Sequence, residues 1–329
     1  MRYYKLQFAS AIHVDSRGSG SPEVADEFVH SDTLSAALCL SRATVFGDWS
    51  DEFFLDPPFR VGSAFPYMGD HLLFPVPAWP IWEDMDPAER KRFKKVRWLS
   101  GPVLERVLAG KILKKDEVAI LPGGIAFSSE EDTAGWENRP PWVLTERQRV
   151  RVDRLGVGDS EPFFFALQFF SPECGLWFPA SVPNETEFRA ALDFLSDSGL
   201  GADRSSGLGH FKVSSEGELA LKTPKKDHGF FLLSLFNPAT EEIPALKEKA
   251  AYGLTTRSGW ISGVPIGRPP VRALTEGSFL PKKPKGRVVE TLKEIKSRLP
   301  NPPAHNAPRD FRAVWFPCAK PPFLREGKT

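Results

Sequence analysis

The residues best suited to chemistry lie in one glycine-rich stretch, Ser198–Phe211, which reads SGLGADRSSGLGHF. Its four glycines surround one arginine and two serines, and a histidine and a lysine follow directly. Glycine reaches positive φ and lets another group approach the main chain closely. Such a loop can enclose an anion with main-chain amides while an arginine supplies charge. The expected ligand is a phosphodiester backbone, and the expected contacts are Gly199, Gly201, Arg204, Ser205, Ser206, Gly207, Gly209, His210 and Lys212.

Two familiar phosphate-binding loops are excluded for this stretch. A Walker A loop needs a Gly-Lys-Ser/Thr sequence, which is missing here. A dinucleotide fingerprint needs a third glycine and opens a helix, whereas this loop follows one. A structural alternative stays open, because glycines at these positions could simply end the helix and form a hairpin turn. The anion-binding interpretation expects free amides near Gly207 and Gly209.

A second candidate is the arginine row in residues 146–154, ERQRVRVDR. Arg147, Arg149 and Arg151 fall on one face of a predicted strand, and the intervening valines fall on the other. Residues two apart on a strand are about 6.6 Å apart, close to the phosphate spacing of an extended single strand. Guanidinium groups suit an RNA backbone, and Arg154 is a further expected RNA contact in this segment. The alternative is a solvated charged face between the neighbouring acidic residues.

Catalytic and metal-binding patterns are weak. The six histidines show no metal-ligand spacing, and no GxSxG elbow or cysteine nucleophile context is present. A metal-independent ribonuclease can use a single histidine as acid or base, and His13 and His30 are the candidates for that alternative. The sequence otherwise predicts no catalytic residue, no metal site and no cofactor.

Composition limits the cellular setting. The 329 residues carry a net charge of +1, so any polyanion site must be a local patch and not a general coat. The three cysteines are far apart, which fits a reducing compartment. No apolar run is long enough to span a bilayer, and the first ten residues are typical of a strand and not of a signal peptide. The expected location is the cytoplasm, without a membrane partner.

The predicted elements describe an α+β protein. The elements of the first part follow the ferredoxin-like βαββαβ order. They are a strand at 3–8, a helix at 30–43 N-capped by Ser31 or Asp32, two strands at 162–170 and 175–180, a helix at 184–198 and a strand at 210–215. Residues 49–145 form an insertion. Its Pro-, Phe- and Trp-rich part, 49–80, is predicted to be irregular, and basic and short helices are expected at 86–100 and 101–111.

A second set of strands is expected after residue 218. The candidate strands are the segments GFFLLSLFN, YGLTTRSGWI, PVRALTEGSF, GRVVETL and FRAVWFP. The expected organisation is therefore a first domain at 1–216, carrying the insertion, and a second, divergent ferredoxin-like domain at 217–329.

Several of these segments resemble a known family. Four segments resemble, in this order, the RAMP superfamily of CRISPR effector proteins: HSDTLSAALC, RVRVDR, GLGADRSSGLGHF and YGLTTRSGWI…PVRALTEGSF. HSDTL and ALTEGS narrow the resemblance to the fourth-subunit family of type III-A (Csm) complexes. The matching segments run from Leu6 to about Val289.

The resemblance implies two ferredoxin-like (RRM-like) domains that grip the 5′ repeat-derived handle of the CRISPR RNA (crRNA). The implied protein partners are the large polymerase/cyclase-type signature subunit and the first backbone RAMP subunit, which carry the catalytic activities. Arg257, in YGLTTRSGWI, joins the expected RNA-binding residues on this basis. Two alternatives remain: a crRNA-processing endoribonuclease of the same superfamily, and a protein-interaction scaffold whose RNA contact is incidental.

Overall fold

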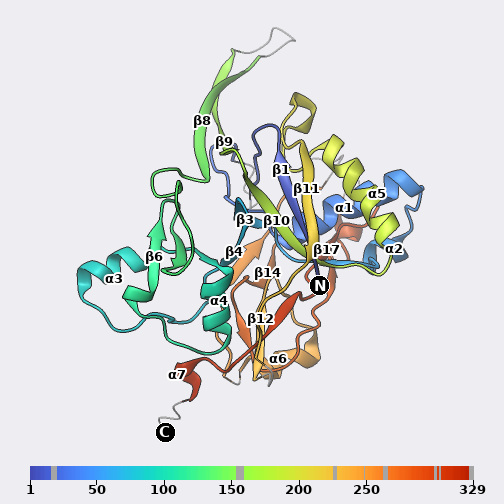
Figure 1. The fold of residues 1–329 in the computed structure, drawn as a ribbon. Helices are drawn as coiled ribbons and strands as arrows, with labels where there is room; N and C mark the ends of the chain where they lie inside the picture. The colour runs from blue at the N-terminus through green and yellow to red at the C-terminus, as the bar shows by residue number, and fades with distance from the viewer. Residues whose placement is uncertain are drawn as a thin grey trace.

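A computed structural model describes residues 1–15, 21–152, 159–224, 228–247, 249–261, 266–299, 302–303 and 305–325. The protein has a mixed α+β fold, which confirms the predicted class (Figure 1). No helix in the described ranges is both long and apolar enough to cross a membrane.

One large sheet dominates the first two thirds of the chain. Its strands follow the order β11-β1-β10-β3-β4-β5-β7-β6, and β2 also pairs with β10. All neighbours are antiparallel except β5 and β7. The bounds are β1 Arg2–Phe8, β2 Arg60–Val61, β3 Phe65–Met68, β4 His71–Pro75, β5 Trp98–Ser100, β6 Val118–Leu121, β7 Ile125–Ser128, β10 Cys174–Ser181 and β11 Phe211–Glu218.

Helices α1 (Ser31–Phe46) and α5 (Glu185–Ser198) pack against one face of this sheet. Tyr4 of β1 and Phe178 of β10 meet Leu38 of α1 and Phe188 of α5 in one buried cluster. The side chain of Asn184 accepts a hydrogen bond from the amide of Glu187, so the predicted cap of α5 is confirmed. For α1 the predicted N-cap is wrong, because His30 occupies that position and its side chain makes no capping bond.

The prediction of an irregular segment at 49–80 is wrong. It contains α2 (Asp51–Leu55) and the sheet strands β2, β3 and β4. The rest of the insertion contributes α3 (Pro87–Phe93), β5, α4 (Gly101–Leu108), the 3₁₀ turn η1 (Lys115–Glu117) and strands β6 and β7. Short strands interrupted by proline show no period-2 pattern in sequence when both faces are buried, as in β3, where all four residues are buried.

Strands β8 (Trp142–Arg151) and β9 (Glu161–Phe170) form a separate two-stranded ribbon. They pair over their whole length, from Trp142 opposite Phe170 to Arg151 opposite Glu161. In Figure 1 the ribbon rises away from the body of the protein. Segment 162–170, expected as the second strand of the first sheet, therefore lies outside that sheet, and β3 occupies the position beside β10.

The last third contains short strands in three small sheets, β15-β12-β18, β13-β14 and β16-β17. Each of the five predicted segments contains at least one of them, which confirms their strand character. The bounds are β12 Gly229–Leu232, β13 Leu254–Arg257, β14 Val271–Leu274, β15 Phe279–Leu280, β16 Val288–Glu290, β17 Pro308–Asp310 and β18 Trp315–Cys318. The helical pieces here are η3 Thr240–Glu242, α6 Ile243–Leu246, η4 Lys296–Arg298 and α7 Pro322–Arg325.

The two parts of the chain share one hydrophobic core. Phe65 and Trp177 of the large sheet lie in the same buried cluster as Phe231, Phe279 and Phe316 of the C-terminal strands. Aromatic side chains of this size dominate the burial energy of a core. The C-terminal strands therefore stabilise the large sheet directly.

Candidate nucleic-acid interface

The glycine-rich loop is held against the end of β1 by main-chain hydrogen bonds. The amide of Gly209 donates to the carbonyl of Ala11 (2.9 Å), and the amide of Ala202 donates to that of His13 (2.9 Å). In the other direction, the amide of Ala9 donates to the carbonyl of His210 (3.0 Å). These hydrogen bonds within the protein give the loop a defined conformation.

Three of the four glycines are required by close packing. A Cβ on Gly201 would lie 2.4 Å from the carbonyl oxygen of His13, and one on Gly209 would lie 2.0 Å from that of Leu200. A Cβ on Gly199 would lie 2.8 Å from the oxygen of Leu208. All three have positive φ. Their presence follows from the fold alone, as the helix-end and turn interpretation expects.

Gly207 differs from the other three. It also has positive φ (86°), where it ends the 3₁₀ turn η2 (Arg204–Ser206), but a Cβ built on it meets no atom within 4 Å. Its backbone conformation favours glycine, while the space beside it is open. Gly207 is therefore the glycine of this loop beside which a ligand has room to approach.

The expected free amides at Gly207 and Gly209 are not found. The amide of Gly207 donates to the carbonyl of Arg204 (3.0 Å), and that of Gly209 is used by Ala11. The amide of Leu208, between them, has no partner among the described residues. The loop offers mainly side chains: those of Arg204, Ser205, Ser206 and Lys212 are exposed and make no hydrogen bond or ion pair within the described ranges.

An ion pair joins the arginine row to this loop. Arg149 of β8 pairs with Asp203, which has a positive φ of 60° directly before η2. The guanidinium carbon of Arg149 lies 4.6 Å from the ring centre of Phe165 on β9, a cation–π distance. The two sites that the sequence predicted separately are therefore neighbours.

The other predicted arginines have different surroundings. Arg147 is exposed and its guanidinium carbon lies 5.4 Å from the ring centre of Phe169. Arg151 pairs with Glu161 across the ribbon (3.6 Å), and both side chains are largely exposed. Alternation along the ribbon puts the three arginines on one face and Val150 on the other, as predicted. Arg154 lies outside the described residues.

Arg257 does not belong to this surface. It is 2% exposed, and both of its hydrogen-bonding nitrogens bind the carboxylate of Asp32 (3.1 Å each) in the interior. A buried guanidinium that already has its carboxylate cannot also bind phosphate at the surface. The prediction of Arg257 as an RNA ligand is corrected accordingly.

The histidines considered for catalysis are buried. His13 is 4% exposed, and its Nδ1 lies 2.7 Å from the carbonyl oxygen of Ala166. His30 is 7% exposed, and its Nδ1 lies 2.8 Å from the carboxylate of Glu276. His210 is half-buried at the end of the loop. Across the described ranges, no group of three or more His, Cys, Asp or Glu side chains could hold a metal ion.

Sequence reasoning missed Asp203 and the aromatic side of the ribbon. Asp203 lies in the loop between the predicted ligands Gly201 and Arg204, and the sequence analysis assigns it no role. The alternation in PFFFALQFF does place Phe163, Phe165 and Phe169 on one face. That pattern could have indicated an aromatic surface beneath the arginines.

Comparisons with known proteins agree with this architecture. Residues 225–299 match the family model of the CRISPR Csm4 C-terminal domain. The "CRISPR system Cms protein Csm4" of Mycobacterium tuberculosis is 26% identical over 245 residues, covering 74% of this chain and 75% of that protein. Its counterpart in Thermococcus onnurineus is 26% identical over 272 residues, covering 78% of this chain and 83% of that protein.

Two solved structures extend the match to the whole fold. A Csm3–Csm4 subcomplex of a type III-A CRISPR–Cas interference complex matches with a TM-score of 0.67 at 16% identity, over 97% of this chain and 100% of that one. A Csm1–Csm4 cassette in complex with cA4 matches with a TM-score of 0.59 at 19% identity, over 97% and 98%.

The chain is similar to Csm4 of type III-A complexes. This confirms the resemblance predicted from sequence. The structural matches cover nearly all of the chain, so the similarity in fold extends into residues 49–145.

Proposed function

We propose that this chain is the RNA-binding subunit of a type III-A CRISPR effector complex and grips the 5′ repeat-derived handle of crRNA. The glycine loop and the arginine face of the ribbon form the grip. As a Csm4-like protein, the chain docks the large signature subunit and the first backbone subunit, the counterparts of the Csm1 and Csm3 that accompany Csm4 in the matching structures. It acts as a structural, non-catalytic component in the cytoplasm.

The ion pair between Arg149 and Asp203 is the observation that carries the proposal. It fixes the ribbon beside the loop and neutralises the loop's carboxylate. Exposed cationic and hydroxyl side chains lie on the same elements: Arg147 on the ribbon, Arg204, Ser205 and Ser206 on the loop, and Lys212 at the start of β11. These groups are typical ligands of a phosphodiester backbone, and Phe165 and Phe169 provide aromatic surface beneath the guanidinium groups.

The proposed fold of each half follows the same family. The order β11-β1-β10-β3 with α1 and α5 on one face corresponds to a ferredoxin-like sheet in which β3 replaces the expected strand 162–170. We assign the C-terminal strands to a second, reduced domain of the same type, with the boundary near residue 217.

The endoribonuclease alternative is disfavoured. An acid or base must reach the atom whose proton it transfers, and the rings of His13 and His30 are buried with Nδ1 already engaged. His13→Ala and His30→Ala should leave guide RNA length unchanged. Accumulation of unprocessed guide RNA in either variant would restore the nuclease.

Salt dependence of guide RNA binding tests the grip. A lost phosphate contact on single-stranded RNA should reduce the slope of log K against log salt by about 0.7. Arg147→Ala and Arg204→Ala should each show this reduction in the reconstituted complex. Arg204→Ala should also cost roughly 1.5–3 kcal/mol of binding if its charged hydrogen bonds are made. Arg204→Lys should recover only part, because an ammonium cannot reproduce a forked contact.

A matched control is available on α3. Lys91 is exposed there and has no ion-pair partner in the part of the chain that the structure describes. Figure 1 places α3 at the opposite side of the molecule from α5, which leads into the loop. Lys91→Ala should leave the slope unchanged. Equal slopes in all variants, together with normal complex assembly in the absence of guide RNA, would instead support the scaffold alternative.

A further inference from the structure

Large apolar side chains are exposed where α1 ends and α2 begins. Leu40, Phe46 and Trp49 are 48%, 45% and 59% exposed, and Val45 and Leu55 are also exposed. The opposite side of α1 is fully used by the core, through residues such as Leu34 and Leu38. Scattered single apolar residues are ordinary on a surface, but a contiguous group marks an interaction site. Tryptophan is especially frequent among residues that anchor protein interfaces.

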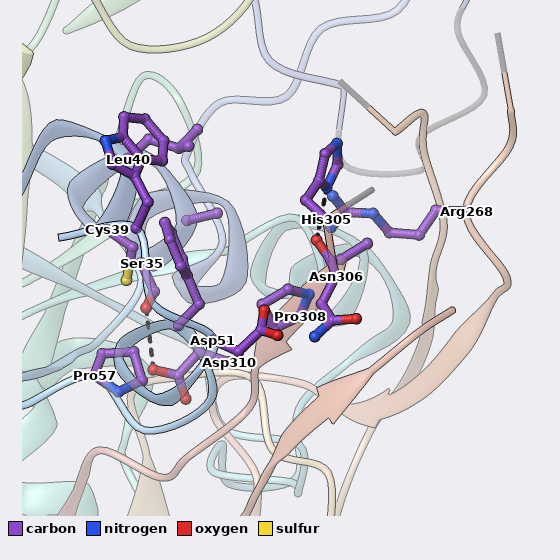
Figure 2. A pocket seen from close by; sticks show the side chains of 14 residues that line it. Ser35, Cys39, Leu40, Asp51, Pro57, Arg268, His305, Asn306, Pro308 and Asp310 are labelled. Atoms are coloured by element: carbon purple, nitrogen blue, oxygen red, sulfur yellow. Dashed lines mark hydrogen bonds between the residues drawn. The ribbon is translucent and has the colours of Figure 1, made fainter. Parts of the chain in front are cut away.

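A pocket opens beside this group. It has a volume of about 480 Å³ and lies between α1, α2 and the segment that includes β17. In Figure 2, Leu40, Cys39 and Ser35 of α1 lie on one side, and Arg268 and His305 lie on the other. Apolar parts of Trp49, Phe54 and Pro57 also line it. A large apolar side chain would fit in such a space.

The charged side chains that line the pocket differ in whether they have a hydrogen-bond or ion-pair partner. Asp310 accepts hydrogen bonds from Ser35 (3.0 Å) and from two nitrogens of Arg312 (2.8 and 3.0 Å). Asp51 is exposed to solvent. Arg268, in contrast, makes no ion pair within the described ranges, and its Nε is buried without a hydrogen-bond partner. A buried polar group without a partner is costly.

The environment of Arg268 disfavours its charge. Burial lowers the pKa of this arginine to about 10, and the nearby positive charge of Arg309 contributes to the shift. An anion beside the guanidinium would offset this penalty. Asp32 and Glu290 act in the opposite direction but offset this effect only in part. The pocket therefore combines an apolar wall with a guanidinium whose charge is incompletely compensated.

We propose that this pocket is a protein-docking site that receives a large apolar side chain of a partner subunit, with a neighbouring carboxylate that pairs with Arg268. The inference rests on the proposed place of the chain in an effector complex. A protein fits better than a nucleotide, because α1 and α2, which line the pocket, carry further exposed apolar side chains at Val45, Phe46 and Leu55. A protein surface can cover such an area, whereas nucleic acids meet cationic and polar surfaces.

The test measures the affinity of the full chain for each of its two proposed neighbours, the large subunit and the backbone subunit. Trp49→Ala should weaken binding to one of them by about tenfold or more. Arg268→Gln should weaken the same partner and reduce the salt dependence of that binding. Guide RNA retained per assembled complex should not change in either variant.

Two exposed residues elsewhere serve as matched controls. Ile112→Ala removes an exposed apolar side chain (41% exposed), and Arg60→Gln removes an exposed arginine. Both should bind both neighbours like the wild type. Thermal unfolding of all four variants checks that Trp49→Ala and Arg268→Gln remain folded.

Other outcomes overturn the inference in distinguishable ways. If Trp49→Ala and Arg268→Gln bind both neighbours normally, the pocket is not a docking site. If they lose guide RNA while retaining both proteins, the occupant is nucleic acid. If the wild-type chain binds neither neighbour, the proposed function itself fails, and this inference fails with it.

Discussion

At the scale of single residues, the glycine loop contains two kinds of glycine. Gly209 is needed because the carbonyl of Leu200 leaves no room for a Cβ, whereas the Cβ position of Gly207 faces open space. Both have positive φ, so a side chain would strain either position by about 1–2 kcal/mol. Only Gly209 adds a steric clash to that strain. Substitutions at the two positions should therefore have different consequences.

Gly209→Ala should destabilise the fold strongly, and Gly207→Val should impair guide RNA binding far more than it lowers the melting temperature. Gly135 is the control, since it has nearly the same φ (85° against 86°) and equally open space beside its Cβ position, away from the loop. Gly135→Val should reproduce the thermal effect of Gly207→Val without the RNA effect. Identical RNA affinities for the two valine variants would show that Gly207 does not face the ligand.

Sequence alone could not separate these glycines. It correctly gave a helix end, a positive-φ loop and an adjoining strand from local spacing. The reason for Gly201 and Gly209, however, is the approach of His13 and Leu200, and the first of these contacts joins segments far apart in sequence. Similarly, YGLTTRSGWI showed that Arg257 lies on a strand but not that Asp32 would bury it. Local pattern predicts conformation, and long-range packing decides exposure.

At the scale of elements, the main difference from expectation concerns which strand pairs with β10. Segment 162–170 has a convincing strand pattern, and it is a strand, but its partner is β8 and not the large sheet. The strand beside β10 is β3, whose four residues are all buried. Burial on both faces removes the alternation by which strands are identified. The alternation rule therefore does not reveal that residues 60–75 belong to the large sheet.

One ion pair ties the ribbon to the glycine loop, in addition to the main-chain hydrogen bonds between Gln168 of β9 and Ile12 (2.9 and 3.0 Å). Arg149 and Asp203 are about one third exposed (34% and 27%), so their coupling should be worth only about 1 kcal/mol. Arg149→Ala or Asp203→Ala should leave global stability nearly unchanged but accelerate amide hydrogen exchange in the part of β8 and β9 nearest the loop. A double-mutant cycle gives the coupling energy directly. A coupling of zero with unchanged exchange would mean that the strands hold the ribbon without this contact.

At the scale of the whole molecule, a buried polar network joins the start of α1 to the C-terminal strands. Asp32 binds Arg257 of β13 and Arg309 of β17, and His30 binds Glu276. The amide of Leu235 also donates to the hydroxyl of Ser31 (3.0 Å). Removing one partner of a buried ion pair typically costs about 3–5 kcal/mol. Together with the shared core around Phe231 and Trp177, this network makes the two parts of the chain one cooperative unit.

The network also predicts how stability depends on pH. Burial alone would raise the pKa of Asp32, but the charges of Arg257 and Arg309 outweigh it and lower the pKa from 3.8 to about 2. Because the folded-state pKa is the lower one, the contribution is fully present above about pH 4 and is lost as the pH falls toward 2. A shift of this size corresponds to roughly 2 kcal/mol. Glu276 acts in the same direction, since His30 beside it holds its pKa below the usual range despite burial.

Urea unfolding of the wild type and of Asp32→Asn at a series of pH values checks this prediction. Asp32→Asn should be less stable by several kcal/mol at pH 6, and the difference should shrink between pH 4 and pH 2 because only the wild type loses an ionised Asp32. Asp70→Asn is the control, because it also replaces an aspartate by asparagine but at a side chain that is fully exposed to solvent. A stability difference between wild type and Asp32→Asn that stays constant from pH 6 to pH 2 would mean that the carboxylate is not ionised in the folded protein. Two separate unfolding transitions in Asp32→Asn would mean that the network, more than the shared core, couples the two parts of the chain.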